Sequence, residues 1–126
     1  MKTFRLSSAV AAILLVSAPA YAQEVGDWVL APWQDSEMDF PGTVVARGSN
    51  NVTIRFDDGT TETRLIGEVR PFDWQRGSRI SCRWSGDDKW YLATITRMDA
   101  NGYTLQIRFD DDGSLEETNT GRCRSR

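Results

Sequence analysis

The 126-residue chain is acidic and has no histidine: 15 basic side chains stand against 18 acidic ones, a formal net charge of −3. This balance argues against nucleic acid or an anionic membrane as a partner, because both require a positive protein surface. Without histidine, neither a Ser-His nor a Cys-His catalytic pair can form. The aspartate-rich turns lack the ligand spacing of an EF-hand, and no Cys/His cluster indicates zinc. We therefore expect no enzyme, no metal site and no cofactor.

The N-terminus has the three parts of a secretory signal peptide. Lys2 and Arg5 form the positive region, residues 9–16 (AVAAILLV) the apolar region, and residues 20–22 (AYA) the cleavage site. An uncleaved membrane anchor is the alternative, but the apolar run is shorter than the ~20 residues that a spanning helix needs. Removal of residues 1–22 would leave 13 basic residues against 18 acidic ones, a net charge of −5. We expect a soluble mature chain that is periplasmic or secreted.

The rest of the chain contains an internal repeat, which is typical of a duplicated module. Each copy has a block that ends in tryptophan, an aromatic residue seven positions later, a strand followed by an acidic turn, and a closing Gly-x-x-Arg. The matching segments are 26–33 (GDWVLAPW) and 77–84 (GSRISCRW), Phe40 and Tyr91, 52–59 (VTIRFDDG) and 105–113 (LQIRFDDDG), and 67–70 and 121–124.

Both copies have the pattern of β-strands, and no helical period of useful length follows the signal. In the second copy, apolar residues at 80, 82 and 84 alternate with polar residues at 79, 81 and 83. Asn101-Gly102 and the two acidic turns are typical of hairpin turns. We expect an all-β fold, in which four or five short strands per copy curl into a small barrel.

The repeat divides the chain into a signal peptide (1–22), a first barrel (23–70), a short linker (71–76) and a second barrel (77–126). Such a short linker should leave the barrels in contact. The outer face of the first strand carries Trp28 and Leu30 in the first copy, where the second copy has polar residues. Because an apolar outer face needs a cover, we expect these two side chains to pack on Phe72 and Trp74 of the linker or on the second barrel.

Cys82 and Cys123 are the only cysteines. In a secreted chain an even number of cysteines favours a disulfide. It would close a loop of about 41 residues, which is worth roughly 3.9 kcal/mol in the chain-entropy model. In a closed barrel the two residues would lie in the first and last strands, which are neighbours. Two separate buried thiols are the alternative.

The repeated motifs resemble the Tudor fold, and specifically tandem Tudor and agenet-like domains. The resemblance rests on WSGDDKWYLATI (84–95) and RFDDDG (108–113) in the second copy and on WQDSEMDFPGTV (33–44) in the first, and it covers nearly all of 26–124. It implies two Tudor/SH3-like barrels that hold methylated lysine or arginine side chains in aromatic cages. By motif, the first cage is Trp33, Phe40, Phe56 and Asp58, and the second is Trp84, Tyr91, Phe109 and Asp111. The aromatic that often follows the turn glycine is replaced by Thr60 and Ser114.

The resemblance implies a non-catalytic module that binds a cationic peptide or protein, or a small quaternary ammonium ligand, because aromatic faces attract cations. The residue pattern also allows a structural interpretation: Phe56 and Phe109 alternate with aliphatic residues as core side chains do, and the aspartates are ordinary turn formers. A structural or interaction protein of the cell envelope, or an SH3-like module that binds cell-wall material, is therefore the alternative.

Overall fold

The computed structural model describes residues 24–126, so the predicted signal peptide lies outside the described residues. Within this range the regular structure is ten strands and two single turns of 3-10 helix, η3 (Ile66–Glu68) and η4 (Thr120–Arg122). The first sheet contains β1 (Trp28–Pro32), β2 (Asp39–Arg47), β3 (Asn51–Phe56), β4 (Thr61–Leu65) and β5 (Arg70–Pro71). The second contains β6 (Arg79–Arg83), β7 (Trp90–Met98), β8 (Thr104–Phe109), β9 (Leu115–Asn119) and β10 (Cys123–Arg124).

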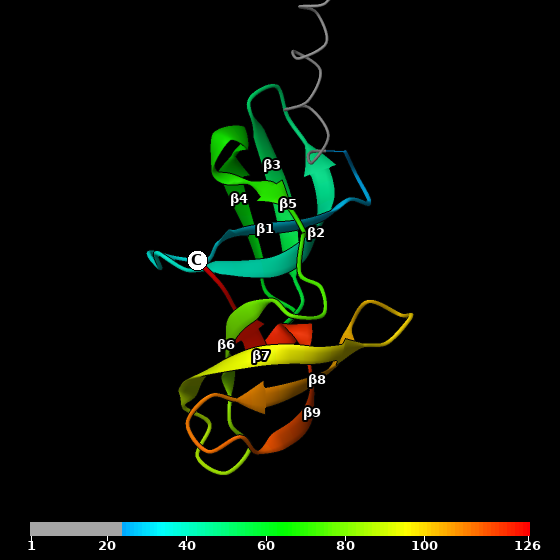
Figure 1. Ribbon diagram of the computed structural model, residues 1–126. Coiled ribbons are helices and arrows are strands. Elements are labelled where there is room, and N and C mark those ends of the chain that lie inside the picture. Colours follow the sequence, from blue (N-terminus) through cyan, green and yellow to red (C-terminus); the bar gives the residue numbers. More distant parts are fainter. Residues whose placement is uncertain (1–23) are drawn as a thin grey trace, which may run out of the picture.

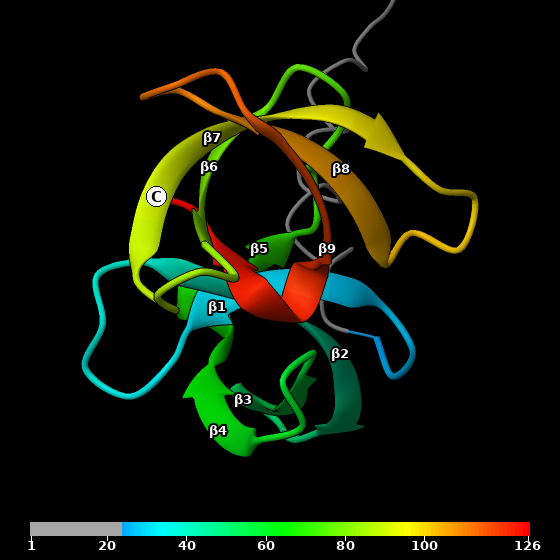
Figure 2. The ribbon, with the colours of Figure 1, turned by 90° about the horizontal axis from the view of Figure 1, so that it is seen from below.

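Each sheet curls into a barrel with the same topology. The strand orders are β4-β3-β2-β1-β5 and β10-β6-β7-β8-β9, with antiparallel neighbours throughout. A register shift after Val44 in β2 and after Ile95 in β7 marks a bulge, which bends a strand and increases its twist. The second barrel is seen nearly end-on in Figure 2, and Figure 1 shows the two barrels stacked one on the other. The predicted all-β fold, with two small barrels in tandem, is confirmed.

Two apolar cores follow from the strand alternation. Val29 and Ala31 of β1 point into the first core, with Val44, Val52, Ile54, Phe56 and Val69. Leu30, on the opposite face of the same strand, is fully buried in the second core together with Trp74, and Phe72 packs against this core. The expected cover for Leu30 is therefore confirmed. β1 contributes to both cores, which joins the barrels through one strand.

Trp28 packs on Phe72 and on the second barrel as expected, but unlike Leu30 it is only half covered. Its ring meets Phe72 edge-on with centroids 6.0 Å apart, and it lies over Gly102 of the second barrel, where an added Cβ would come 2.3 Å from the ring. The residue nevertheless remains 53% exposed. The linker and the β7–β8 hairpin shield one side of the indole and leave the other to solvent.

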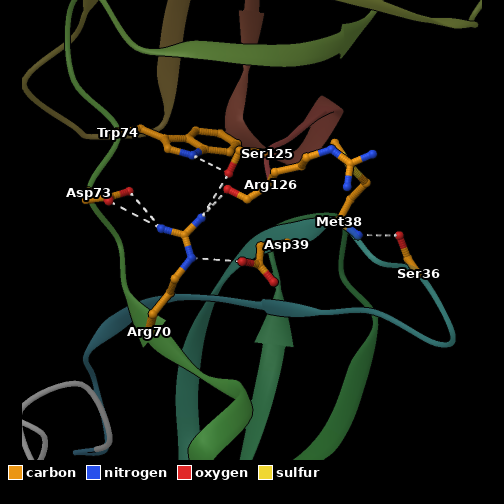
Figure 3. A network of polar contacts seen from close by, with 8 residues as sticks. All are labelled: Ser36, Met38, Asp39, Arg70, Asp73, Trp74, Ser125 and Arg126. Atoms are coloured by element: carbon orange, nitrogen blue, oxygen red, sulfur yellow. Dashed lines mark hydrogen bonds and ion pairs between the residues drawn. The ribbon is translucent and has the colours of Figure 1, made fainter.

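A polar network fixes the contact between the barrels (Figure 3). Arg70 donates from Nε to Asp39 Oδ2 at 2.8 Å and from Nη2 to the Arg126 carbonyl oxygen at 3.0 Å. Trp74 donates from its buried indole N–H to Ser125 Oγ at 3.0 Å. The backbones of Asp39 and Ser125 exchange two hydrogen bonds, of 2.6 and 2.9 Å. The C-terminal residues of the second barrel are thus paired with β2 of the first.

The predicted disulfide between Cys82 and Cys123 is confirmed. The two residues are directly opposed in β6 and β10, and both are buried in the second core. The bond therefore ties together the first and last strands of the second barrel.

Replacing both cysteines by alanine should lower the free energy of unfolding by roughly 4 kcal/mol, because the open chain regains the loop-closure entropy. Urea denaturation followed by circular dichroism measures this change. The reduced wild-type protein, which keeps the volume of both side chains, is the matched control and should lose a similar amount. A loss below about 1 kcal/mol in both would contradict a stabilising role for the bond.

Candidate functional site

The four residues predicted for the second cage line one pocket. This pocket, of about 130 Å³, is bounded by Trp84, Tyr91 and Phe109 and by the acidic turn at Asp111, Asp112 and Ser114. Trp84 and Tyr91 meet edge-on at 6.2 Å between centroids, and Tyr91 and Phe109 do so at 6.3 Å. Three rings, of which Tyr91 is roughly perpendicular to the other two, and the carboxylates of one turn therefore surround a small cavity, here called the second-barrel cage.

The strands place these rings at different depths. Phe109 is the last residue of β8 and is only 5% exposed, so it belongs to the core and forms the floor of the cage. Tyr91 lies near the start of β7 and is partly buried. Trp84 follows β6 and is 43% exposed. Phe109 thus fits the core interpretation while it also forms the cage floor, whereas the exposed Trp84 does not fit the core interpretation.

The polar groups of the cage have distinct roles. The Tyr91 hydroxyl donates to Asp87 Oδ2, and this hydrogen bond lowers the pKa of Asp87 and raises the pKa of Tyr91. Asp112 accepts hydrogen bonds from the backbone N–H and the hydroxyl of Ser114, which lower the pKa of Asp112. Asp111 makes no side-chain hydrogen bond or ion pair with any residue in 24–126, so its carboxylate is available to a cation.

Gly86 and Asp87 support the cage, and the sequence prediction missed both. The turn after Trp84 folds back so that the N–H groups of Asp87 and Asp88 point to the Trp84 carbonyl oxygen. An added Cβ on Gly86 would come 2.5 Å from the Trp84 ring, so the indole lies directly against this glycine. The Ser-Gly-Asp-Asp sequence between the two aromatics was the available signal.

The first-copy residues do not enclose a comparable cavity. Trp33 and Phe40 meet edge-on at 5.7 Å and line a larger pocket together with Asp58. Phe56 does not line it, because this ring is 2% exposed within the first core. Asp58 accepts hydrogen bonds from the N–H and hydroxyl of Thr60 within its own turn. Phe40 also meets Trp90 of the second barrel at 6.1 Å, so the ring faces the other barrel.

The larger pocket lies between the barrels and has a volume of about 760 Å³; we call it the inter-barrel pocket. Its first-barrel wall is aromatic and acidic, and its second-barrel wall carries arginines. The main residues are Trp33, Asp35, Phe40, Asp57 and Asp58 on one side and Arg83, Asp88, Trp90, Arg122 and Arg124 on the other. The residue pattern of the sequence does not predict this site, which requires both barrels.

No three residues among the Cys, Asp and Glu side chains of 24–126 are grouped closely enough to hold a metal ion. Over the same range no helix has the length and apolar character needed to cross a membrane.

No family model and no curated protein matches the chain. Among solved structures it is similar to the AGD34 segment of AGDP1 from Arabidopsis thaliana, with 17% identity, coverage of 83% of each chain and a TM-score of 0.39. It is also similar to the tandem Agenet domain 3-4 of ADCP1, with 16% identity, coverage of 87% of this chain and 84% of the other, and a TM-score of 0.40. The site geometry, and not these similarities, carries the functional argument.

Substitution of Asp57 and of Asp112 by asparagine should change the urea midpoint at pH 7 in opposite directions. Asp57 is half-buried, and its desolvation raises its pKa although the Thr120 hydroxyl donates to it at 2.5 Å. A raised pKa means that the folded state is penalised once pH rises through that pKa. Asp57→Asn keeps an oxygen for Thr120, so its urea midpoint should exceed that of the wild type at pH 7. The gain should shrink as pH falls and Asp57 becomes protonated.

Asp112→Asn is the matched control, because the pKa of Asp112 is lowered by its hydrogen bonds with Ser114. A lowered pKa stabilises the folded state at pH values above the pKa of the unfolded chain. This stabilisation is lost as pH falls through the pKa of the folded state. Asp112→Asn should therefore lower the midpoint at pH 7 and have less effect in acid. The same pH trend in both variants would refute these assignments.

Proposed function

We propose that the protein is a non-catalytic binding module whose second-barrel cage binds a cationic group, such as a lysine, methylated lysine or arginine side chain of a peptide, or a quaternary ammonium compound. The observation that supports this most directly is the convergence of Trp84, Tyr91 and Phe109, with the unpaired carboxylate of Asp111, on one cavity. The proposal is that these residues act together as the ligand site.

The physical basis is cation–π attraction combined with one negative charge. Each aromatic face stabilises a bound cation by about 0.5–2 kcal/mol. A methylated ammonium has fewer N–H groups to satisfy, so it leaves water at lower cost than a free ammonium. Asp111 adds Coulomb attraction and accepts any remaining N–H. The cavity of about 130 Å³ is well below the roughly 300–1,000 Å³ of sites for whole small molecules, so it suits a head group alone.

We further propose that the module acts in the periplasm or after secretion. The Cys82–Cys123 disulfide is compatible with an oxidising compartment, and the N-terminal sequence has the pattern of a secretory signal. The ligand is then a cationic peptide, protein or small molecule that is present outside the cytoplasm.

Trp84→Ala should weaken binding of N-acetyl trimethyllysine amide by roughly 2- to 30-fold, the equivalent of one lost cation–π contact of about 0.5–2 kcal/mol. Trp84 is 43% exposed, so the fold should persist. Isothermal titration calorimetry measures the affinity, and circular dichroism checks the fold. Trp28→Ala is the control, because Trp28 is similarly exposed, at 53%, but lies outside the cage.

Two results would count against the cage. Equal weakening in both variants would remove the special role of Trp84. Absence of wild-type binding to lysine, trimethyllysine, arginine and choline alike would instead favour the alternative of an interaction protein or a cell-wall-binding module.

Gly86→Ala should weaken the same ligand without unfolding the protein, because the new Cβ would displace the Trp84 ring against which Gly86 lies. The Trp84 signals in NMR spectra should shift in the absence of ligand. Gly67→Ala is the control: nothing lies within 4 Å of its added Cβ. An affinity of Gly86→Ala equal to that of Gly67→Ala would show that the Trp84 position does not matter for binding.

A further inference from the structure

Arg70 and Arg124 are equivalent residues of the two copies. Each ends the closing Gly-x-x-Arg segment, and each lies in the short last strand that pairs with the first strand of its barrel. Arg70 stands opposite Leu30, and Arg124 stands opposite Ser81, the residue that corresponds to Leu30. The two guanidinium groups therefore start from the same place in the same fold.

The partners of the two arginines differ. Arg70 donates from Nε to the carboxylate of Asp39 at 2.8 Å. In the pairing of β1 with β2, Asp39 stands opposite Pro32. In the equivalent pairing of β6 with β7, Trp90 stands opposite Arg83, so Trp90 occupies the position of Asp39. The second copy thus has an indole where the first has the carboxylate that satisfies its arginine.

Arg124 lies on that indole without an acidic partner. Its guanidinium carbon is 4.0 Å from the centroid of Trp90 and 5.9 Å from that of Phe40. Its Nε is buried and has no hydrogen-bond partner, and within 24–126 its side chain forms no hydrogen bond or ion pair. Burial and the nearby Arg83 lower the pKa of Arg124, but an arginine remains charged in proteins.

The surroundings leave positive charge uncompensated on this wall. Arg83 also contacts Trp90, with 4.5 Å from its guanidinium carbon to the ring centroid. Arg122 pairs with Asp88 at 2.8 Å, and Arg83 approaches the same carboxylate at 4.0 Å. One aspartate thus serves two guanidinium groups and none reaches Arg124. The other acidic residues of the inter-barrel pocket, at 35, 57 and 58, belong to the first-barrel wall.

We propose that the inter-barrel pocket is a second binding site, in which Arg124, stacked on Trp90, binds a carboxylate of a peptide ligand: an aspartate or glutamate side chain, or the chain terminus. The ligand supplies the group that Asp39 supplies to Arg70. Planar guanidinium groups match carboxylates with two parallel hydrogen bonds. The volume of about 760 Å³ admits a peptide segment, and the acidic, aromatic opposite wall suits a segment with charges of both signs. This site is independent of the second-barrel cage.

Titration of the full mature chain with the peptide acetyl-Lys-Gly-Asp-Gly-amide, followed by NMR at the Arg124 Nε–H, tests the proposal. We expect saturable binding that shifts this signal and that is about tenfold or more weaker when asparagine replaces the aspartate of the peptide. Arg124→Gln should abolish the difference between the two peptides. Arg97→Gln, which removes the same charge from the exposed part of β7, should preserve it.

Equal affinity for the aspartate and asparagine peptides would overturn the proposal. So would an equal loss in the two arginine variants, which would indicate a general charge effect, or tighter binding of inorganic phosphate than of the peptide at Arg124. The Arg124 Nε–H reports on the inter-barrel pocket, which Trp84 does not line, so the shift of this signal should be unchanged in Trp84→Ala even where the lysine of the peptide also enters the second-barrel cage. The failure of one site is therefore distinguishable from the failure of the other.

A second test restores the arrangement of the first copy. Trp90→Asp should place a carboxylate beside Arg124 as Asp39 is placed beside Arg70, whereas Trp90→Asn removes the same ring without supplying the charge. We expect a higher urea midpoint for Trp90→Asp than for Trp90→Asn, and no such difference in an Arg124→Gln background. The absence of a difference in the wild-type background would show that Arg124 is not positioned for a carboxylate.

Discussion

The contact between the barrels, centred on Arg70, determines how the barrels are oriented and thereby the shape of the pocket between them. Arg70 pairs with Asp39 in its own barrel and donates to Ser125 and Arg126 at the end of the other. An ion pair that is partly exposed, as this one is, contributes little free energy by itself. The main stabilisation comes from burial of Leu30 and Trp74, and the directional hydrogen bonds choose one orientation among those that this burial permits. Because residues of both barrels line the inter-barrel pocket, that orientation gives the pocket its shape.

Duplication and divergence explain the asymmetry between the copies. The strand registers are the same in both, so the backbone of each barrel supplies equivalent positions. Two of the differences lie on surfaces that an isolated barrel would expose. Leu30 of the first copy, at the position of Ser81 in the second, provides an apolar contact. Trp90 of the second copy, at the position of Asp39 in the first, provides an aromatic surface next to this contact. These side chains give the pair of barrels a contact and a pocket that neither barrel forms alone.

The sequence predicted those features that depend on local chemistry. Strand alternation, turn residues and the repeat indicated the barrels, and the barrel topology brings Cys82 and Cys123 together. The second-barrel cage could be found by motif because all its residues lie on adjacent strands and one turn. The residues predicted for the first cage do not enclose a comparable cavity. Phe56 is one of the alternating buried side chains of β3, and Phe40 turns toward Trp90. The inter-barrel pocket depends on how two folded units meet, and no local pattern of residues encodes that geometry.

The position of each cage ring also determines how a site can change without loss of the fold. Phe109 is both cage floor and core, at 5% exposure, so a substitution there alters stability and binding together. Trp84 is held against Gly86 by a turn and contributes little to the core, so a substitution there need not alter the core. Arg124 lies between these cases: its guanidinium rests on Trp90 with no hydrogen-bond or ion-pair partner among residues 24–126, and its backbone pairs with β6 beside the disulfide. The fold holds that arginine in place through its main chain, so a change of its side chain need not disturb the strand pairing.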